Sequence, residues 1–128
     1  MSYETLYHED LVDHYRHPRN CGVLEHADFS SGVCNPLCGD QVSIAGIIKD
    51  NTITQCMFQA KGCVISVAAA SMLTEQSIGR SLKEVLALDK NAMLALVKVK
   101  LGPTRLRCAL LALEALQNAL KEYQKKGT

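Results

Sequence analysis

The sequence predicts a single α+β domain in which helices pack on one face of a small antiparallel sheet. Three observations predict this class. Two segments with strand-like alternation are joined by a short turn, the segments with helical periodicity mostly follow them, and the chain has only 128 residues. A chain of this size is expected to form one domain, here residues 1–128. Such a domain buries about two-thirds of the surface that its unfolded chain exposes, so its core needs neither a metal nor a disulfide.

The first predicted element is a helix over residues 6–15, where apolar side chains recur at helical spacing. It ends before Pro18, because a residue that precedes proline is driven out of the helical conformation. Residues 19–35 are polar and rich in turn formers. This composition predicts a long loop.

Two strands are predicted next, over residues 41–48 and 52–60. In the first, Val42, Ile44 and Ile48 recur at even spacing, although Gly46 interrupts the pattern. The second is rich in residues that favour strands, and residues 49–51 have the composition of a turn. Together they predict an antiparallel hairpin.

Four helices are predicted after the hairpin. Residues 63–77 are rich in alanine and predict a buried helix that Gly79 ends. Ser81 and Glu84 have the spacing of a capping box, which predicts a short helix to about residue 88.

The last two helices follow from a cap and from a leucine pattern. Asp89 can cap a helix that ends near residue 98. A longer helix is expected from residue 104 or 105 to residue 123, followed by a frayed tail. Its apolar face is marked by leucines at helical spacing: Leu106, Leu110, Leu113, Leu116 and Leu120.

Composition limits the kinds of partner and the compartment. The formal net charge is +1, so no charge pattern typical of nucleic-acid or anionic-membrane binding is present. No apolar run has the length of a membrane span, and the first residues do not resemble a secretory signal. We therefore expect a cytoplasmic protein with reduced thiols, in which the six cysteines serve metal or sulfur chemistry rather than disulfides.

Three of the cysteines and one carboxylate stand where turns meet regular elements. Cys38 and Asp40 flank a glycine before the first predicted strand, Cys63 begins the alanine-rich helix, and Cys108 is expected in the first turn of the last helix. A helix N-terminus favours thiolate over thiol, and thiolates bind zinc, copper(I) or iron–sulfur clusters. The four residues therefore predict one soft-metal site.

The carboxylate distinguishes this donor set from that of a permanent cluster site, which usually has four cysteines. A hard oxygen ligand matches soft iron poorly, so Asp40 should weaken the hold on a cluster. The same four ligands would also suit tetrahedral zinc.

The remaining candidate ligands have simpler interpretations. Cys56 lies in a predicted strand and is interpreted as a core residue. Cys21 and Cys34 lie in the predicted loop, and we interpret Cys34 as an unligated thiol, although its spacing from Cys38 would let both approach one metal. We interpret the histidines as surface or half-buried groups rather than ligands; they are His8, His14, His17 and His26.

Short motifs occur in a characteristic order along the chain: Asp13-His14-Tyr15, Pro18-Arg19-Asn20, Cys38-Gly39-Asp40, Gly62-Cys63 and Leu106-Arg107-Cys108-Ala109. With them, nearly the whole chain resembles the U-type iron–sulfur cluster assembly scaffolds, the IscU/SufU group that includes the N-terminal domain of NifU. The resemblance implies a single NifU-like N-terminal domain with the SufE/NifU-like α+β sandwich.

The resemblance also implies a function. Cys38, Cys63 and Cys108 would bind a transient [2Fe–2S] cluster, and Asp40 would be the labile ligand that regulates its release. Sulfur would come from a cysteine desulfurase, and the cluster would pass to apo-proteins. Such a protein is a scaffold or carrier rather than an enzyme.

Two departures from the IscU type concern the segment before Cys108. IscU-type members have a histidine where this chain has Arg107, and arginine has no free lone pair for a metal. Their Leu-Pro-Pro-Val-Lys segment, recognised by an Hsp70-type chaperone, is replaced here by residues 101–105, Leu-Gly-Pro-Thr-Arg, which makes that recognition doubtful.

Both departures resemble the SufU type, although this chain lacks the insertion that SufU-type members usually carry. The alternative function is therefore a zinc-dependent sulfurtransferase that accepts persulfide sulfur from a SufS-type desulfurase. In that alternative Cys108 would be the acceptor, while Cys38, Asp40 and Cys63 would hold Zn2+.

Overall fold

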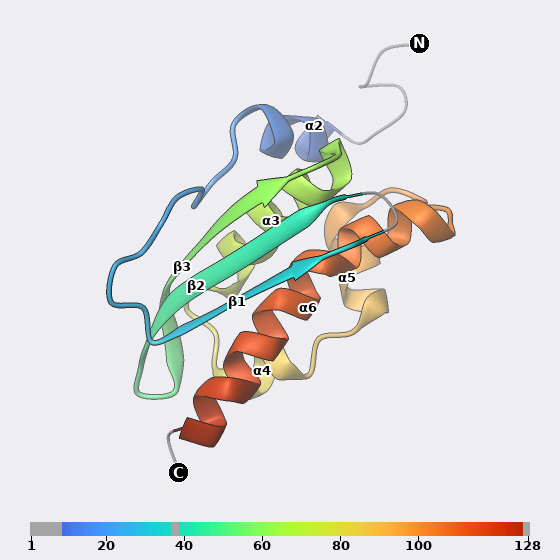
Figure 1. The fold of residues 1–128 in the computed structure, drawn as a ribbon. Coiled ribbons are helices and arrows are strands. Elements are labelled where there is room, and N and C mark those ends of the chain that lie inside the picture. Colours follow the sequence, from blue (N-terminus) through green and yellow to red (C-terminus); the bar gives the residue numbers. More distant parts are fainter. Residues whose placement is uncertain (1–8, 37–38, 127–128) are drawn as a thin grey trace.

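Three antiparallel strands in the order β1-β2-β3 form one layer of the protein, and helices cover one face of it (Figure 1). The computed structural model describes residues 9–36 and 39–126. The strands are β1 (Phe29–Cys34), β2 (Gln41–Lys49) and β3 (Thr52–Lys61). The predicted α+β class and the predicted β2–β3 hairpin are confirmed.

The prediction of a loop throughout residues 19–35 is wrong, because β1 lies within it. This strand pairs with β2 from Phe29↔Gly46 to Cys34↔Gln41. The ring of Phe29 fills the space beside Gly46, where a Cβ atom would collide with it. Gly46 interrupts the alternation of β2, and its missing side chain leaves the space that the Phe29 ring of β1 occupies.

The helices that the structure describes are α2 (Glu9–Arg16), α3 (Val64–Ser77), α4 (Leu82–Leu86), α5 (Lys90–Val97) and α6 (Pro103–Lys126). Each corresponds to a predicted helix. Residues 6–8 of the first predicted helix lie outside the described part. The last helix begins at Pro103, which suits a first helical position, and continues to Lys126, beyond its predicted end at residue 123. Residues 127 and 128 of the predicted frayed tail lie outside the described residues.

Both predicted caps are present. The Ser81 hydroxyl accepts a hydrogen bond from the Glu84 backbone N–H, and the Glu84 carboxylate accepts one from the Ser81 backbone. The Asp89 carboxylate accepts a hydrogen bond from the backbone N–H of Ala92 at the start of α5. Among the helices described, none has the length and apolar character needed to cross a bilayer.

Helix α3 is the centre of the core, because it packs against the sheet and against α2, α5 and α6. Ten of its residues are buried, including Ala68, Ala69 and Ala70, whose small side chains let neighbouring elements approach closely. The alanine-rich sequence thus predicted its burial correctly. The first residue of α3 follows Cys63, so this central helix positions one of the candidate ligands.

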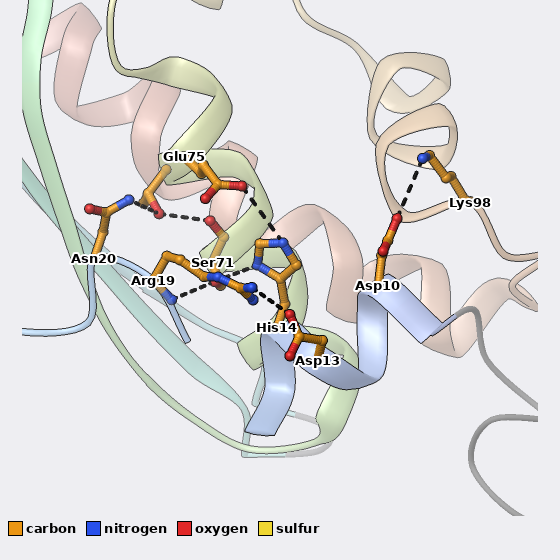
Figure 2. Close-up of polar contacts among 9 residues, drawn as sticks. Asp10, Asp13, His14, Arg19, Asn20, Ser71, Glu75 and Lys98 are labelled. Carbon is orange, nitrogen blue, oxygen red and sulfur yellow. Dashed lines mark hydrogen bonds and ion pairs between the residues drawn. The ribbon is translucent and has the colours of Figure 1, made fainter. Parts of the chain in front are cut away.

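Polar contacts attach α2 and the segment after it to α3 (Figure 2). Nδ1 of His14 lies 2.7 Å from Oγ of Ser71, and the same hydroxyl oxygen accepts a hydrogen bond from the Arg19 backbone N–H at 2.8 Å. The guanidinium of Arg19 pairs with Asp13, and the amide of Asn20 donates to the Thr74 hydroxyl. Residues of the Asp13-His14-Tyr15 and Pro18-Arg19-Asn20 motifs therefore hold α2 and the segment after it against α3.

His14 is buried, with an exposed fraction of 9%, so its interpretation as a surface or half-buried group is wrong. Burial lowers its pKa, the positive charge of Arg19 lowers it further, and the carboxylate of Glu75 opposes them. The unfolded chain, with a histidine pKa of about 6.5, therefore takes up the proton more readily than the folded chain does.

We expect the metal-free protein to lose stability as the pH falls below about 6.5, because protonation of His14 favours the unfolded state. Thermal denaturation between pH 7.5 and pH 5 measures this loss. His14→Gln should reduce this dependence of the melting temperature on pH. The control His26→Asn should leave it unchanged; asparagine is chosen there because it tolerates the positive φ of +57° at position 26. If the stability of His14→Gln depends on pH as that of the wild-type protein does, His14 is not the source of the loss at low pH.

Candidate metal centre

Asp40, Cys63 and Cys108 meet at one end of the sheet. One ligand atom from each lies within 4.8 Å of the others, although the residues come from three separate parts of the chain. The pairing of Gln41 with Lys61 places Asp40 beside the end of β3, where α3 begins. The structure therefore brings together three of the four predicted ligands, and the fourth, Cys38, lies outside the described residues.

Cys63 occupies the N-cap position of α3, with the extended backbone that such a position requires. The sequence predicted this placement. Its side chain is half-buried, and its sulfur lies 3.6 Å from the hydroxyl of Ser66. The thiol is thus close to the first unpaired N–H groups of the helix, where a negative charge is favoured.

Cys108 lies in the second turn of α6, because that helix begins at Pro103, so its predicted place in the first turn is wrong. Its side chain is 4% exposed. Burial raises the pKa of the Cys108 thiol to about 12, with further contributions from hydrogen bonds to Asp40 and Cys63. In the metal-free protein this thiol therefore holds its proton, contrary to the expected thiolate, and a bound metal must displace it.

Asp40 is 4% exposed and has several hydrogen-bond donors around its carboxylate. Its Oδ2 accepts a hydrogen bond from the Ser66 hydroxyl at 2.6 Å. Burial raises the pKa of Asp40, but hydrogen bonds from Ser66, Cys63 and Cys108 outweigh burial and hold the pKa below its usual value. Asp40 is therefore a buried carboxylate that stays ionised beside the protonated thiol of Cys108.

Gly62 makes room for this carboxylate. It has a φ of +146°, and a Cβ atom there would collide with the Oδ1 and Cγ atoms of Asp40. Glycine tolerates both the backbone conformation and the close approach.

We expect Gly62→Ala to destabilise the fold by about 1–3 kcal/mol and to weaken metal binding, because the new methyl group strains the backbone and displaces Asp40. Gly79→Ala is a matched control. Gly79 has a φ of +91°, but apart from Gly79 and its two chain neighbours no atom of the described residues lies within 4 Å of the place that its new methyl group would take. Urea denaturation of both variants measures the loss of stability, and zinc titration measures the loss of metal affinity. Equal zinc affinity in the two variants would show that the collision with Asp40 has no effect on the site.

The other described cysteines lie apart from this group of ligands. Cys56 is buried in β3, and burial raises its pKa to about 12, in agreement with its interpretation as a core residue. Cys21 and Cys34 are exposed free thiols. Cys34 belongs to β1 rather than to a loop, and Cys21 forms an isolated bridge with Phe58.

Ser66 was not predicted from the sequence, although it contacts the predicted ligands. It lies three residues after Cys63, on the same side of α3, and its hydroxyl also lies 3.5 Å from the backbone oxygen of Cys108. The spacing from Cys63 was the available signal, but a serine inside an alanine-rich helix suggests only close packing.

The donor chemistry suits a soft or borderline metal. Two sulfur atoms and one carboxylate oxygen are ligands that tetrahedral zinc accepts, and cysteine sulfur is the usual ligand of iron–sulfur clusters. Of the described residues, only Asp40, Cys63 and Cys108 form a group of three or more such side chains close enough to share a metal.

Comparison with known proteins gives matches over nearly the whole chain. The family model described as "NifU-like N terminal domain" matches residues 6–128. The iron–sulfur cluster assembly scaffold protein IscU 1 of Archaeoglobus fulgidus is 36% identical over 122 residues, which cover 95% of this chain and 79% of that protein. The scaffold protein IscU of Haemophilus influenzae is 36% identical over 124 residues, which cover 94% of this chain and 97% of that protein.

Solved structures agree with the fold. A NifU-like N-terminal protein from Brucella abortus has a TM-score of 0.79 at 20% identity, with 97% of this chain and 98% of that one covered. A protein of Fervidobacterium islandicum, described as a scaffold for iron–sulfur cluster assembly in the SUF system, has a TM-score of 0.77 at 26% identity, with 93% and 99% covered. Both the IscU and the SUF descriptions thus occur among its relatives.

Proposed function

Because the chain belongs to the NifU-like N-terminal domain family, we propose that it is an iron–sulfur cluster assembly scaffold that builds a [2Fe–2S] cluster and transfers it to apo-proteins. The cluster is cargo in this proposal, and the protein is a carrier rather than an enzyme. Iron and sulfide are the building blocks, and a cysteine desulfurase supplies the sulfur.

The observation that carries the proposal is the presence of a buried carboxylate in a group of cysteines. Asp40 lies within 4.8 Å of the ligand atoms of Cys63 and Cys108. With Cys38, the proposed ligand set is three sulfurs and one oxygen. Oxygen is the weakest of these ligands for iron in a cluster, so Asp40 is the proposed point of release.

The protonated state of Cys108 also suits temporary binding. The pKa of its thiol is raised to about 12, so loading requires loss of a proton and release allows the proton to return. Hydrogen bonds to Asp40 then satisfy the thiols of Cys63 and Cys108 in the empty protein. The side chains of the site therefore have hydrogen-bond partners among themselves when no metal is bound, which suits a carrier.

The second candidate function is zinc-dependent transfer of persulfide sulfur from a SufS-type desulfurase. Arg107, in place of a potential histidine ligand, favours it, and the donor set suits zinc. The burial of Cys108 counts against it, because an acceptor thiol must be reached by the donor and ionise readily. We therefore favour the scaffold function.

Anaerobic reconstitution with iron and sulfide, together with metal analysis of the protein as isolated, separates the two functions. A scaffold should develop the visible absorption of a [2Fe–2S] cluster, which is lost when apo-ferredoxin is added. Tightly bound zinc with no transferable cluster would refute the scaffold proposal and support the alternative.

A further inference from the structure

Ser66 is a completely buried hydroxyl within the proposed metal centre. Its exposed fraction is 0%, and it lies on α3 one turn after the N-cap residue Cys63. Its Oγ lies 2.6 Å from Oδ2 of Asp40, 3.6 Å from Sγ of Cys63 and 3.5 Å from the backbone oxygen of Cys108. One side chain thus touches each of the three residues that converge on the site.

The shortest of these contacts decides how the hydroxyl is used. A hydroxyl has one proton to donate, and the ionised carboxylate of Asp40 is the strongest acceptor nearby. A hydrogen bond to a charged acceptor in a buried place is stronger than one between neutral groups. Ser66 therefore donates to Asp40, and the contact to the Cys108 backbone oxygen is secondary.

This hydrogen bond restricts the orientation of the carboxylate. Oδ2 is held by Ser66 on α3, while Oδ1 lies against the backbone of Gly62. Rotation of the carboxylate would break the first contact and disturb the second. The direction in which Asp40 presents an oxygen to the two thiols is therefore fixed from two sides.

We propose that Ser66 is a positioning residue that fixes the Asp40 carboxylate toward the thiols of Cys63 and Cys108 and so determines how firmly Asp40 holds a metal. This inference rests on the proposed function, in which Asp40 is a ligand. It adds a residue that does not contact the metal itself. Partners of this kind orient a ligand, and their loss typically lowers metal affinity about 10- to 100-fold.

Anaerobic titration of the metal-free protein with Co2+ tests the inference, because cobalt–thiolate absorption reports binding directly. Ser66→Ala should weaken Co2+ binding about tenfold. Ser77→Ala is the matched control. It removes another buried hydroxyl from α3, and within the described chain that hydroxyl has no hydrogen-bond partner, so Co2+ affinity should stay unchanged.

The Asp40→Ala background shows whether Ser66 acts through Asp40. There, adding Ser66→Ala should cause no further loss, because the carboxylate that it orients is gone. An equal loss in both backgrounds would overturn the inference and assign Ser66 a general packing role. Wild-type affinity in Ser66→Ala, or no Co2+ binding by the wild-type protein, would also overturn it.

A second pair of variants covers the case in which Ser66→Ala does not fold. Ser66→Thr and Ser66→Val add the same bulk but differ in the hydroxyl, so the threonine variant should bind Co2+ more tightly than the valine variant. Equal affinity in this pair would overturn the inference.

The inference and the proposed function fail in different ways. Loss of Co2+ affinity in Ser66→Ala without a transferable cluster in the wild-type protein would refute only the scaffold function. A transferable cluster with wild-type Co2+ affinity in Ser66→Ala would refute only the role of Ser66.

Discussion

Cys108→Ser is expected to abolish assembly of a [2Fe–2S] cluster. The Cys108 sulfur is one of the three converging candidate ligand atoms, and a serine hydroxyl neither ionises readily nor binds soft iron well. The yield of reconstituted cluster should fall by more than about 100-fold, beyond the loss that follows removal of a residue that only orients a ligand. Visible absorption and bound iron after anaerobic reconstitution measure it.

The control for this variant is Cys21→Ser. Cys21 is an exposed thiol outside the group formed by Asp40, Cys63 and Cys108, so its replacement should leave the cluster yield unchanged. Thermal denaturation of both metal-free variants separates a lost ligand from a lost fold. A Cys108→Ser protein that is folded and still forms the wild-type amount of cluster would remove Cys108 from the ligand set.

The second large effect is expected for Asp40→Cys, which should slow cluster release about tenfold or more, because a sulfur ligand binds soft iron more firmly than a carboxylate does. The measurement is the rate at which reconstituted protein restores the spectrum of apo-ferredoxin. The cluster yield should not fall, since four sulfur ligands are the usual set for a permanent cluster.

Glu122→Cys serves as the control for the added thiol. Glu122 is exposed near the C-terminal end of α6, away from Cys108 near its start, so the transfer rate should match that of the wild-type protein. If Asp40→Cys transfers its cluster as fast as this control, Asp40 is not the point of release.

Most of the fold was predictable because its signals are local. The alternation within residues 41–48, the capping box at Ser81 and the leucine spacing of the last helix each depend on neighbouring residues only. Strand β1 has no such signal. Its six residues, Phe29–Cys34, are mostly small or polar, and it forms because Phe29 packs beside Gly46 and the strand pairs with β2.

The candidate ligands Asp40, Cys63 and Cys108 could be selected from their local motifs, and the structure brings them together, but the protonation state of Cys108 could not be predicted. A helix N-terminus suggested a thiolate at Cys108, whereas burial and the neighbouring Asp40 raise the pKa of its thiol. Burial depends on residues distant in the chain. For the same reason the sequence did not show that Ser66 reaches Asp40, which lies 26 residues earlier.

The most direct test of the scaffold function is stoichiometric transfer of a cluster from the reconstituted wild-type protein to apo-ferredoxin under anaerobic conditions. The proposed function predicts that the ferredoxin spectrum appears as the scaffold loses its own absorption, and that the metal-free chain can then be loaded again. A protein that holds zinc, or retains its cluster with no ferredoxin formed, would contradict it.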